Sequence, residues 1–565
     1  MVFSVVPFRV MGSVIVKKKQ GRDYLYYVES GRVDGKPRIV KQVYLGTPET
    51  VKERARRGEP SAVRTLSAGP LVLWHLAESL GIRKRLDEQV DSSNLAYSVG
   101  TILQLVIVNR LSAPCSKLQL AEWYATTALE PVTGVPVSAL DHRRVWDAMD
   151  RLDAEQIECV EQALVEHLVD AGIVDDELLM FDPTNFYTYI ASDNERCEIA
   201  KRGHNKQKRN DLRQVGMALL TTRQYRLPLL HRTYVGNQTD APTTRFVAHD
   251  LARRCDAVLR RASRVTIVYD RGCQSKELLT LFEPEQLSFV CGLAASSFRR
   301  QLSVDRDKLL TVDGLDGHHC QRSRVTIDKR RYTLLCVRSE SFAGKQRAGF
   351  MQTLAKAERQ LAEYAEAAAS PKSRRTRTKL TKLIDVVLAK RHLSDVITYE
   401  ITGTERNPTL TWSVDHAVID ELEDSTFGRT LLLTDRDDWT DEQIISAYHG
   451  LNRNERAMSQ LKNTDYINAR PIFHWTDDKI RVHLFCCVLA LLVTNDLHRR
   501  THHDTKLKSP ERALDALAQI NQVELIYHTG KRGRPTTTRH LTELSPTQTS
   551  LLTALNITPH QLTTG

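Results

Sequence analysis

YHGLNRNERAMSQLK, residues 448–462, has the spacing of an amphipathic helix with a carboxylate on its apolar face. At about 100° per residue, Ile444, Tyr448, Leu451 and Met458 form one narrow apolar stripe, and Glu455 lies in the middle of it. A carboxylate on a buried helix face is costly unless a cation, hydrogen-bond donors or a metal ion pairs with it. The stretch therefore predicts that Glu455 belongs to a site.

Composition indicates what kind of protein carries this helix. A chain of 565 residues is too long for one compact core, so we expect about two to four domains. Lys and Arg number 80 against 69 Asp and Glu, and the net charge of +11 suggests a polyanionic partner. With 41% hydrophobic residues the chain is predicted to fold rather than to be disordered.

The cysteines and apolar runs argue against a zinc, secreted or membrane protein. The 10 cysteines show no CxxC spacing, which predicts reduced thiols in a cytosolic protein. His318, His319 and Cys320 lack a second cluster to complete a tetrahedral site, so we interpret them as a polar turn. The apolar run 482–493 is too short to span a bilayer and predicts a buried helix, and residues 1–13 do not resemble a signal peptide.

Changes in hydrophobic period divide the chain into six segments. We expect a small antiparallel β domain at 1–61, a helical DNA-binding or dimerisation domain at 62–175, the first part of an α/β core at 176–292, a β-rich α+β insertion at 293–429, the second part of the core at 430–500, and a basic helical tail at 501–565. Within the core, the strands at 214–222 and 227–236 are close enough in sequence to form an antiparallel hairpin.

Two predicted strands of the core end in an aspartate. LLMFD ends at Asp182 and VTIVYD ends at Asp270, and turn-forming residues follow each of them. The order of the strands predicts that these two lie side by side with their aspartates adjacent. If the helix of Glu455 packs on that sheet, three carboxylates meet, and they repel one another unless divalent cations lie between them. Oxygen-only ligation favours Mg²⁺ or Mn²⁺, and two such ions can promote in-line cleavage of a phosphodiester.

These motifs, taken in order, resemble the DDE-class transposases of bacterial and archaeal insertion sequences. The residues that carry the resemblance are FDPTNFYTY (181–189), RGHNKQKRNDLRQVGMALL (202–220), GNQTDA (236–241), VTIVYDRGCQSKE (265–277), and YHGLNRNERAMSQLK (448–462) followed by ARPIFHWTDDKIRVHLFCCVLALLV. The resemblance implies an RNase H-like core, interrupted by a β-rich insertion, and a catalytic, metal-binding triad of Asp182, Asp270 and Glu455. It also implies about two Mg²⁺ ions per site, replaceable by Mn²⁺.

The same resemblance implies partners and a place in the cell. The expected partner is double-stranded DNA, both the terminal inverted repeats of the element and its target, bound by a homodimer without any membrane. The expected location is the prokaryotic cytoplasm, in association with the nucleoid.

In the transposase group that this chain resembles, the helix carries Tyr, Arg, Glu and Lys at fixed spacing. Tyr448, Glu455 and Lys462 match this signature, and Leu451 replaces the Arg. Tyr448 and Lys462 each lie about 10 Å along the helix from Glu455, which suits contacts to DNA phosphates, although a core tyrosine and a surface lysine would have the same pattern.

Basic segments supply the remaining DNA-binding candidates. They are Arg202, His204 and Lys206 after the first aspartate, Arg271 after the second, and Arg532 and Arg534 in KRGRP, which is similar to the core of an AT hook. Trp412 and Trp439 are candidates for stacking on an unpaired base, beside the ordinary role of packing. Three functions stay open at this point: a transposase, a stand-alone metal-dependent nuclease, and an inactive relative that only binds DNA.

Overall fold

The computed structural model describes most of the chain. The described residues are 11–19, 21–33, 36–56, 60–174, 177–191, 193–203, 209–238, 264–273, 279, 287–294, 298–370, 375–470, 472–504, 507, 509–527 and 535–564, without the side chains of 11, 32–33, 36–37, 53–56, 273 and 452–456. They form two compact units. Unit 1 holds the described residues before 239 and those from 452 onward, and unit 2 holds 264–451.

Unit 1 begins with a small antiparallel sheet, as its alternating sequence predicts. The strands are β1 (Met11–Lys19), β2 (Arg22–Val33) and β3 (Lys36–Gly46), followed by the helix α1 (Pro48–Arg56). Lys17, Lys18 and Lys19 are exposed on β1. The sheet packs on the C-terminal part of the chain, where Val43 contacts Val523 and Leu525.

Helices follow, and polar caps explain where several of them begin. They are α2 (Gly69–Ser79), α3 (Ile82–Gln89), α4 (Val99–Ser112), α5 (Leu120–Ala125), α6 (Glu130–Thr133), α7 (His142–Met149) and α8 (Ala154–Asp170). Ser98 caps α4, Asp141 caps α7, and Asp153 forms a capping box with Gln156 at α8. The helical character predicted for 62–175 is confirmed, although the segment starts with a strand, β4 (Ala62–Ser67).

The helical core is completed by α18 (Asp477–Thr501), from much later in the chain. By length and composition α18 is apolar enough to cross a membrane, but 94% of its most apolar window is buried inside the structure. It contacts α2, α4, α7, α8, α19 and α20. The buried helix predicted at 482–493 is therefore confirmed, and residues 62–175 do not close a core by themselves.

The C-terminal segment differs from the helical tail that we expected. It contains the helices α19 (Pro510–Ala518) and α20 (Pro546–Ala554) and the strands β17 (Asn521–Tyr527) and β18 (Thr536–Leu541). β17 pairs antiparallel with both β18 and β4, which gives a three-stranded sheet. Val523, Leu525 and Tyr527 alternate with the period of a strand. The strand β4, from the N-terminal part of the chain, pairs with one edge of β17.

Unit 1 also holds the first strands of the α/β core. They are β5 (Leu178–Tyr187), β6 (Lys201–Arg202), β7 (Arg213–Thr222) and β8 (Pro228–Val235), and each of the others pairs antiparallel with β7. The hairpin predicted at 214–222 and 227–236 is confirmed as β7 and β8.

Unit 2 is built on a mixed sheet of the order β11-β12-β13-β16-β10-β9. Its strands are β9 (Val265–Tyr269), β10 (Leu287–Leu293), β11 (Leu310–Thr311), β12 (His318–Ile327), β13 (Arg330–Ser339) and β16 (Arg429–Thr434). β9 and β10 are parallel, and the remaining pairs are antiparallel. Strands and flanking helices together make the fold mixed α/β.

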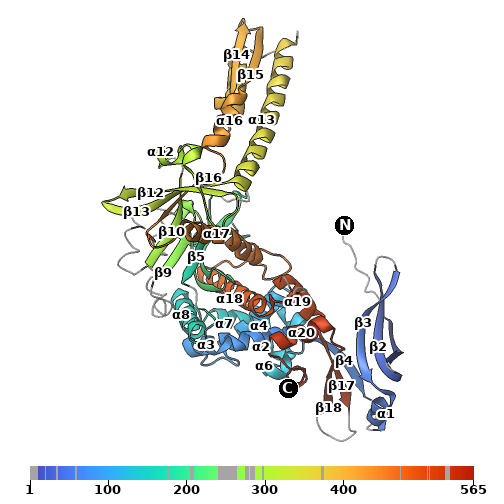
Figure 1. The fold of residues 1–565 in the computed structure, drawn as a ribbon. Coiled ribbons are helices and arrows are strands. Elements are labelled where there is room, and N and C mark those ends of the chain that lie inside the picture. Colours follow the sequence, from blue (N-terminus) through green and yellow to red (C-terminus); the bar gives the residue numbers. More distant parts are fainter. Residues whose placement is uncertain are drawn as a thin grey trace. The chain divides into compact units, whose positions relative to one another are not determined.

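The expected β-rich α+β insertion at 293–429 contains both helices and strands, with more helical than strand residues, and its β12 and β13 belong to the same sheet as β9 and β10. The part that stands apart contains α13 (Glu340–Ala369), α14 (Arg377–Leu388), α15 (Leu393–Val396), the hairpin of β14 (Ile397–Gly403) and β15 (Pro408–Val414), and α16 (His416–Ser425). Figure 1 shows α13 running alongside this hairpin. Phe350, Leu354, Leu361, Leu380 and Leu410 belong to its own apolar core.

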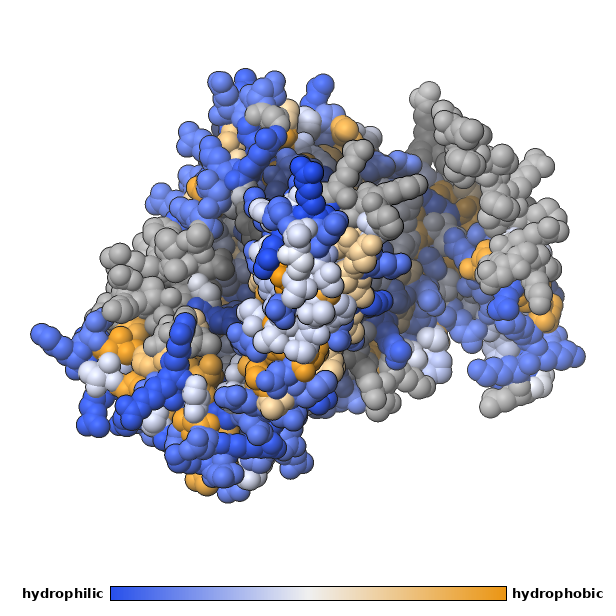
Figure 2. Space-filling view, turned by 90° about the horizontal axis from the view of Figure 1, so that it is seen from above, coloured by the Kyte–Doolittle hydropathy of each residue, from blue (hydrophilic) through white to orange (hydrophobic). Residues whose placement is uncertain are grey.

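The surface of the described residues matches the charged composition. In Figure 2 the visible face is mostly hydrophilic, and hydrophobic residues appear in small separate groups. Exposed aromatic side chains are therefore exceptions, and Phe473 and Trp475, 70% and 53% exposed, are among them.

Candidate active site

Asp270 lies where a fully buried strand reaches the surface. All five residues of β9 are buried, Asp270 is exposed, and a short 3-10 helix, Arg271–Cys273, follows. The predicted strand that ends in a carboxylate is confirmed here. The Tyr448 hydroxyl, from helix α17 (Asp441–Leu461), donates a hydrogen bond of 3.1 Å to Oδ1 of Asp270.

The helix predicted from the opening stretch is confirmed, and most of its described stripe is buried or half-buried. Ile444 and Met458 are buried, and Tyr448 and Leu451 are half-buried. α17 includes position 455, but the Glu455 side chain lies outside the described residues.

A glycine that the sequence reading missed makes room for Tyr448. A Cβ atom on Gly292, in β10, would lie 2.4 Å from the Tyr448 hydroxyl oxygen. Side chains larger than hydrogen would therefore displace the tyrosine from Asp270. The signal in the sequence is the glycine inside the apolar run LSFVCGL, because glycine within a strand often marks a close approach.

The surroundings of Tyr448 keep its hydroxyl protonated. Burial raises the pKa of Tyr448 well above its usual value, and the negative charge of Asp270 and the hydrogen bond to it raise this pKa further. The hydroxyl is thus a permanent donor to Asp270 at neutral pH. We expected Tyr448 to contact a DNA phosphate; in the structure its hydroxyl contacts a proposed metal ligand.

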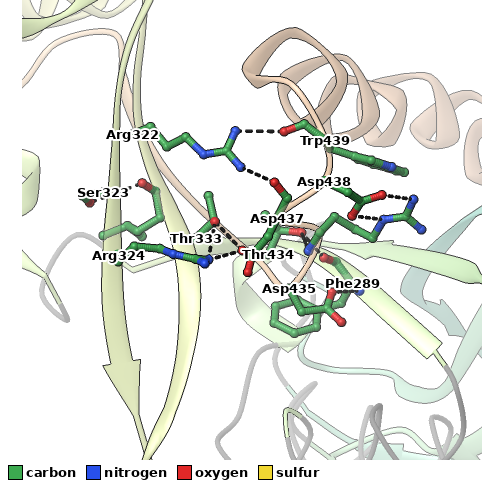
Figure 3. Close-up of polar contacts among 12 residues, drawn as sticks. Phe289, Arg322, Ser323, Arg324, Thr333, Thr434, Asp435, Asp437, Asp438 and Trp439 are labelled. Atoms are coloured by element: carbon green, nitrogen blue, oxygen red, sulfur yellow. Dashed lines mark hydrogen bonds and ion pairs between the residues drawn. The ribbon is translucent and has the colours of Figure 1, made fainter.

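The loop that leads into α17 is held by the sheet of unit 2, as Figure 3 shows. Asp435 accepts a 2.8 Å hydrogen bond from the Phe289 amide and pairs with Arg264 at 3.0 Å. Burial raises the pKa of Asp435, although the Phe289 amide and Arg264 oppose that effect. Arg436 forms two bonds to Asp438, of 3.0 and 2.8 Å. The segment that follows β16 is therefore tied to β10 and to the residue before β9.

Two arginines of β12 complete this anchor. Arg322 donates to the Trp439 carbonyl at 2.8 Å and to Oδ1 of Asp441 at 3.0 Å. Arg324 bonds Asp437, which also accepts a 2.6 Å bond from Thr333. Burial alone would raise the pKa of Asp437, but the bonds from Arg324 and Thr333 hold it below its usual value.

Trp439 packs under an arginine of the same loop. The Arg436 guanidinium lies 4.6 Å from the centre of its ring. This is a packing contact, the ordinary role that we weighed against base stacking for this residue.

Asp182 does not end its strand, contrary to our expectation. β5 continues through Pro183 to Tyr187, and its pairing with β7 runs from Leu179 opposite Thr222 to Tyr187 opposite Gln214. Only alternate residues of an antiparallel strand point their N–H at a given neighbour, so a strand tolerates proline at the other positions. The segment after Asp182 is therefore sheet rather than turn.

Lys462, at the end of α17, contacts the face of β5 that carries Asp182. Asp182, Thr184 and Phe186 share that face because side chains alternate along a strand. The Lys462 ammonium donates a 2.6 Å hydrogen bond to Oγ1 of Thr184 and lies 5.3 Å from the centre of the Phe186 ring. Asp182 itself is half-buried.

The remaining basic candidates fall into two groups. Arg202 on β6 and Arg271 after Asp270 are exposed and accessible to a ligand. His204, Lys206, Arg532 and Arg534 lie outside the described residues, the last two between β17 and β18.

The His318–Cys320 cluster is a strand start and not the polar turn that we expected. These residues open β12, where the buried Cys320 thiol donates to Asp441 at 3.2 Å and His319 lies 3.2 Å from Glu340. Burial, followed by Asp441, raises the pKa of the Cys320 thiol to about 12, so it stays protonated. Within the described part of the chain, no group of three His, Cys, Asp or Glu side chains is arranged to hold a metal ion.

Comparison with solved structures finds distant likeness to a transposase complex. No family model matches the chain, and no curated protein matches its sequence. A cryo-EM structure of a piggyBac transposase synaptic complex with hairpin DNA matches with a TM-score of 0.37 and 10% identity, over 80% of this chain and 79% of that one. A likeness of this size does not establish a shared fold or function.

Proposed function

We propose that the chain is a DNA transposase of an insertion sequence. It cuts DNA at the ends of its element and joins the exposed 3′ hydroxyls to target DNA. Asp182, Asp270 and Glu455 hold Mg²⁺ or Mn²⁺ in this proposal, about two ions per site. Double-stranded DNA is the substrate, and the chain works in the cytoplasm of a prokaryote.

The observation that carries the proposal is the pair of contacts made by α17. Seven residues before Glu455, Tyr448 bonds the carboxylate of Asp270 within unit 2. Seven residues after it, Lys462 bonds Thr184, two positions from Asp182 on the same face of β5, within unit 1. Tyr448 thus contacts one proposed metal ligand, and Lys462 contacts the strand face that carries another, which supports the choice of these two aspartates.

The residues suit a hard divalent cation. Asp270 is an exposed carboxylate and Asp182 is half-buried, and carboxylate oxygens are the ligands that Mg²⁺ prefers. When bound, Mg²⁺ supplies Lewis-acid polarisation of the phosphodiester. The Tyr448 hydroxyl orients Asp270, as partners of metal ligands commonly do, and Lys462 and Arg271 supply positive charge for DNA phosphates.

Replacing the three carboxylates tests the proposal. Loss of a hydrogen-bond partner of a metal ligand already costs about 10- to 100-fold, so loss of a ligand should cost more. We expect Asp182→Asn, Asp270→Asn and Glu455→Gln each to lower cleavage of DNA carrying the element ends by more than about 100-fold. Retention of that DNA on a gel should change little, because phosphate contacts elsewhere supply most of the affinity.

Asp515→Asn is the matched control, since Asp515 also accepts a hydrogen bond from a tyrosine, Tyr466. Cleavage by the unaltered chain should need Mg²⁺ or Mn²⁺ and survive a zinc-selective chelator. Substantial cleavage by any of the three triad variants would overturn the site. Cleavage without joined end–target products would favour a stand-alone nuclease instead.

A further inference from the structure

Three exposed aromatic side chains gather on unit 1, beyond the end of β5. Thr188 forms an isolated parallel bridge with Ile472, and the Tyr189 amide donates to the Ile472 carbonyl at 2.9 Å. This pairing brings Tyr189 against Phe473, and their rings stack at 5.6 Å with 26° between their planes. Tyr189 is 47% exposed, and the more exposed Phe473 and Trp475 offer still larger apolar surfaces to solvent.

Arginines lie beside Trp475 and beside Tyr187, the neighbour of Tyr189. The Arg196 guanidinium lies 5.2 Å from the Trp475 ring centre. Arg470 and Arg209 lie 5.5 and 5.9 Å from the ring of Tyr187, which itself meets Tyr189 edge to face. Arg209 also pairs with Asp211 through two bonds, so Arg196 and Arg470 are the stronger candidates for an anion.

Backbone contacts hold the surface in shape. Asn194 donates to the Trp475 carbonyl at 3.0 Å, and Asp477 accepts the amides of Glu198 and Ile199 at 2.9 and 3.2 Å. The loop before β6 is thereby tied to the start of α18. A surface that is already ordered loses little conformational entropy when a ligand binds.

We infer that Tyr189, Phe473 and Trp475 stack on unpaired bases of DNA, while Arg196 and Arg470 contact the adjoining phosphates. Flat exposed rings beside guanidinium groups are complementary to the two parts of a single-stranded nucleotide, the base face and the phosphate. The inference rests on the proposed function only in taking DNA as the ligand. Tyr189 is seven residues beyond Asp182, roughly 20 Å along an extended chain, so the bases bound here are not those at the cut.

Anisotropy of labelled DNA tests this inference in the full chain carrying Asp270→Asn. The probes are a blunt duplex and the same duplex with a single-stranded extension. We expect Phe473→Leu and Trp475→Ala each to weaken binding of the extended duplex by about 5- to 150-fold, the range for loss of one base–aromatic stack. Binding of the blunt duplex should stay within about twofold, and Phe473→Tyr, which keeps the ring, should restore the preference.

Trp146→Ala is the control, because Trp146 is a 40% exposed tryptophan of the same unit and lies elsewhere, on helix α7. Equal binding of the extended duplex by Phe473→Leu and the parent chain would overturn the inference. A variant that changes the oligomeric state but not the preference for the extended duplex would also overturn the inference. That result would mean that this surface contacts a second copy of the chain. Failure of the proposed function appears separately, as cleavage retained by Asp270→Asn.

Discussion

Asp270 and Tyr448 show how much one residue depends on its neighbours. An exposed aspartate after a strand is ordinarily a turn former, and a tyrosine on a helix stripe is ordinarily core. Their 3.1 Å hydrogen bond links the two residues, and in the proposed function it orients a carboxylate that would hold the metal ion. Gly292 is part of the same arrangement because its lack of a side chain leaves room for the Tyr448 hydroxyl.

Tyr448→Phe isolates that hydrogen bond. We expect cleavage to slow about tenfold, at the low end for a bond to a charged group, since Asp270 is exposed. The variant should also need more Mg²⁺ for half-maximal rate, which a purely structural tyrosine would not cause. Tyr466→Phe, which removes the bond to Asp515, should change neither quantity. An unchanged Mg²⁺ requirement in Tyr448→Phe would contradict the positioning role.

Gly292→Ala tests the space beside Tyr448. The new methyl group would meet the hydroxyl at 2.4 Å, and overpacking of this kind costs about 1–3 kcal/mol. We expect that loss in the free energy of unfolding, together with slower cleavage. Gly344→Ala on α13, where a Cβ atom meets nothing, is the control. Denaturant unfolding of both variants and the parent chain gives the comparison. Gly344→Ala should be no less stable than the parent, because alanine favours a helix over glycine. A Gly292→Ala variant as stable as the parent would mean that Tyr448 shifts without cost.

At the scale of elements, α17 and α18 are helices of opposite character. The start of α17 is anchored by Arg322 of β12 and its Tyr448 bonds the exposed Asp270, whereas α18 is buried along nearly all its length. α18 nevertheless contains His483, which is buried and bonds the Ala469 carbonyl at 3.2 Å. Burial, followed by the nearby Lys117, lowers the pKa of His483 well below its usual value.

Because its pKa is lowered on folding, we expect His483 to make the free energy of unfolding depend on pH. Because the pKa is lowered in the folded chain, the unfolded chain takes up the proton first. Stability is complete above the unfolded pKa of about 6.5 and falls below it, by about 1.4 kcal/mol per pH unit for this one group. Urea unfolding at pH 7 and pH 5.5 should show that loss, and His483→Gln should reduce the slope. An identical slope in the variant would show that His483 does not control the effect.

At the scale of the whole molecule, segments from both ends of the chain build unit 1. β4 and β17 pair with nearly the whole chain between them, and α18 packs among α2, α4 and α8. Removing the N-terminal segments therefore removes partners of the C-terminal ones. A truncation that is meant to remove DNA binding would also expose the apolar face of α18, so point substitutions are the cleaner tests.

Assembly on DNA is the prediction at this scale. In the proposed reaction two ends are cut and joined to one target, so one site per chain would require at least two chains held together. We expect light scattering to show a dimer or larger complex when DNA carrying the element ends is present. The basic charge of +11 predicts that this complex weakens as salt rises. Strand transfer completed by a single chain on a single end at high dilution would exclude this assembly.

The sequence by itself determined the features that repeat along the chain. The stripe of α17, the buried runs of β9 and α18 and the hairpin of β7 and β8 were all readable, because burial on one face or on all sides leaves a local period. Only the tertiary structure decided that β5 continues past Pro183, that β17 pairs with β4, and that Tyr448 meets Asp270 beside Gly292. Each of these three features depends on a segment that is distant in sequence and supplies a strand edge, a hydroxyl group or space for a side chain. No local pattern encodes which distant segment that is.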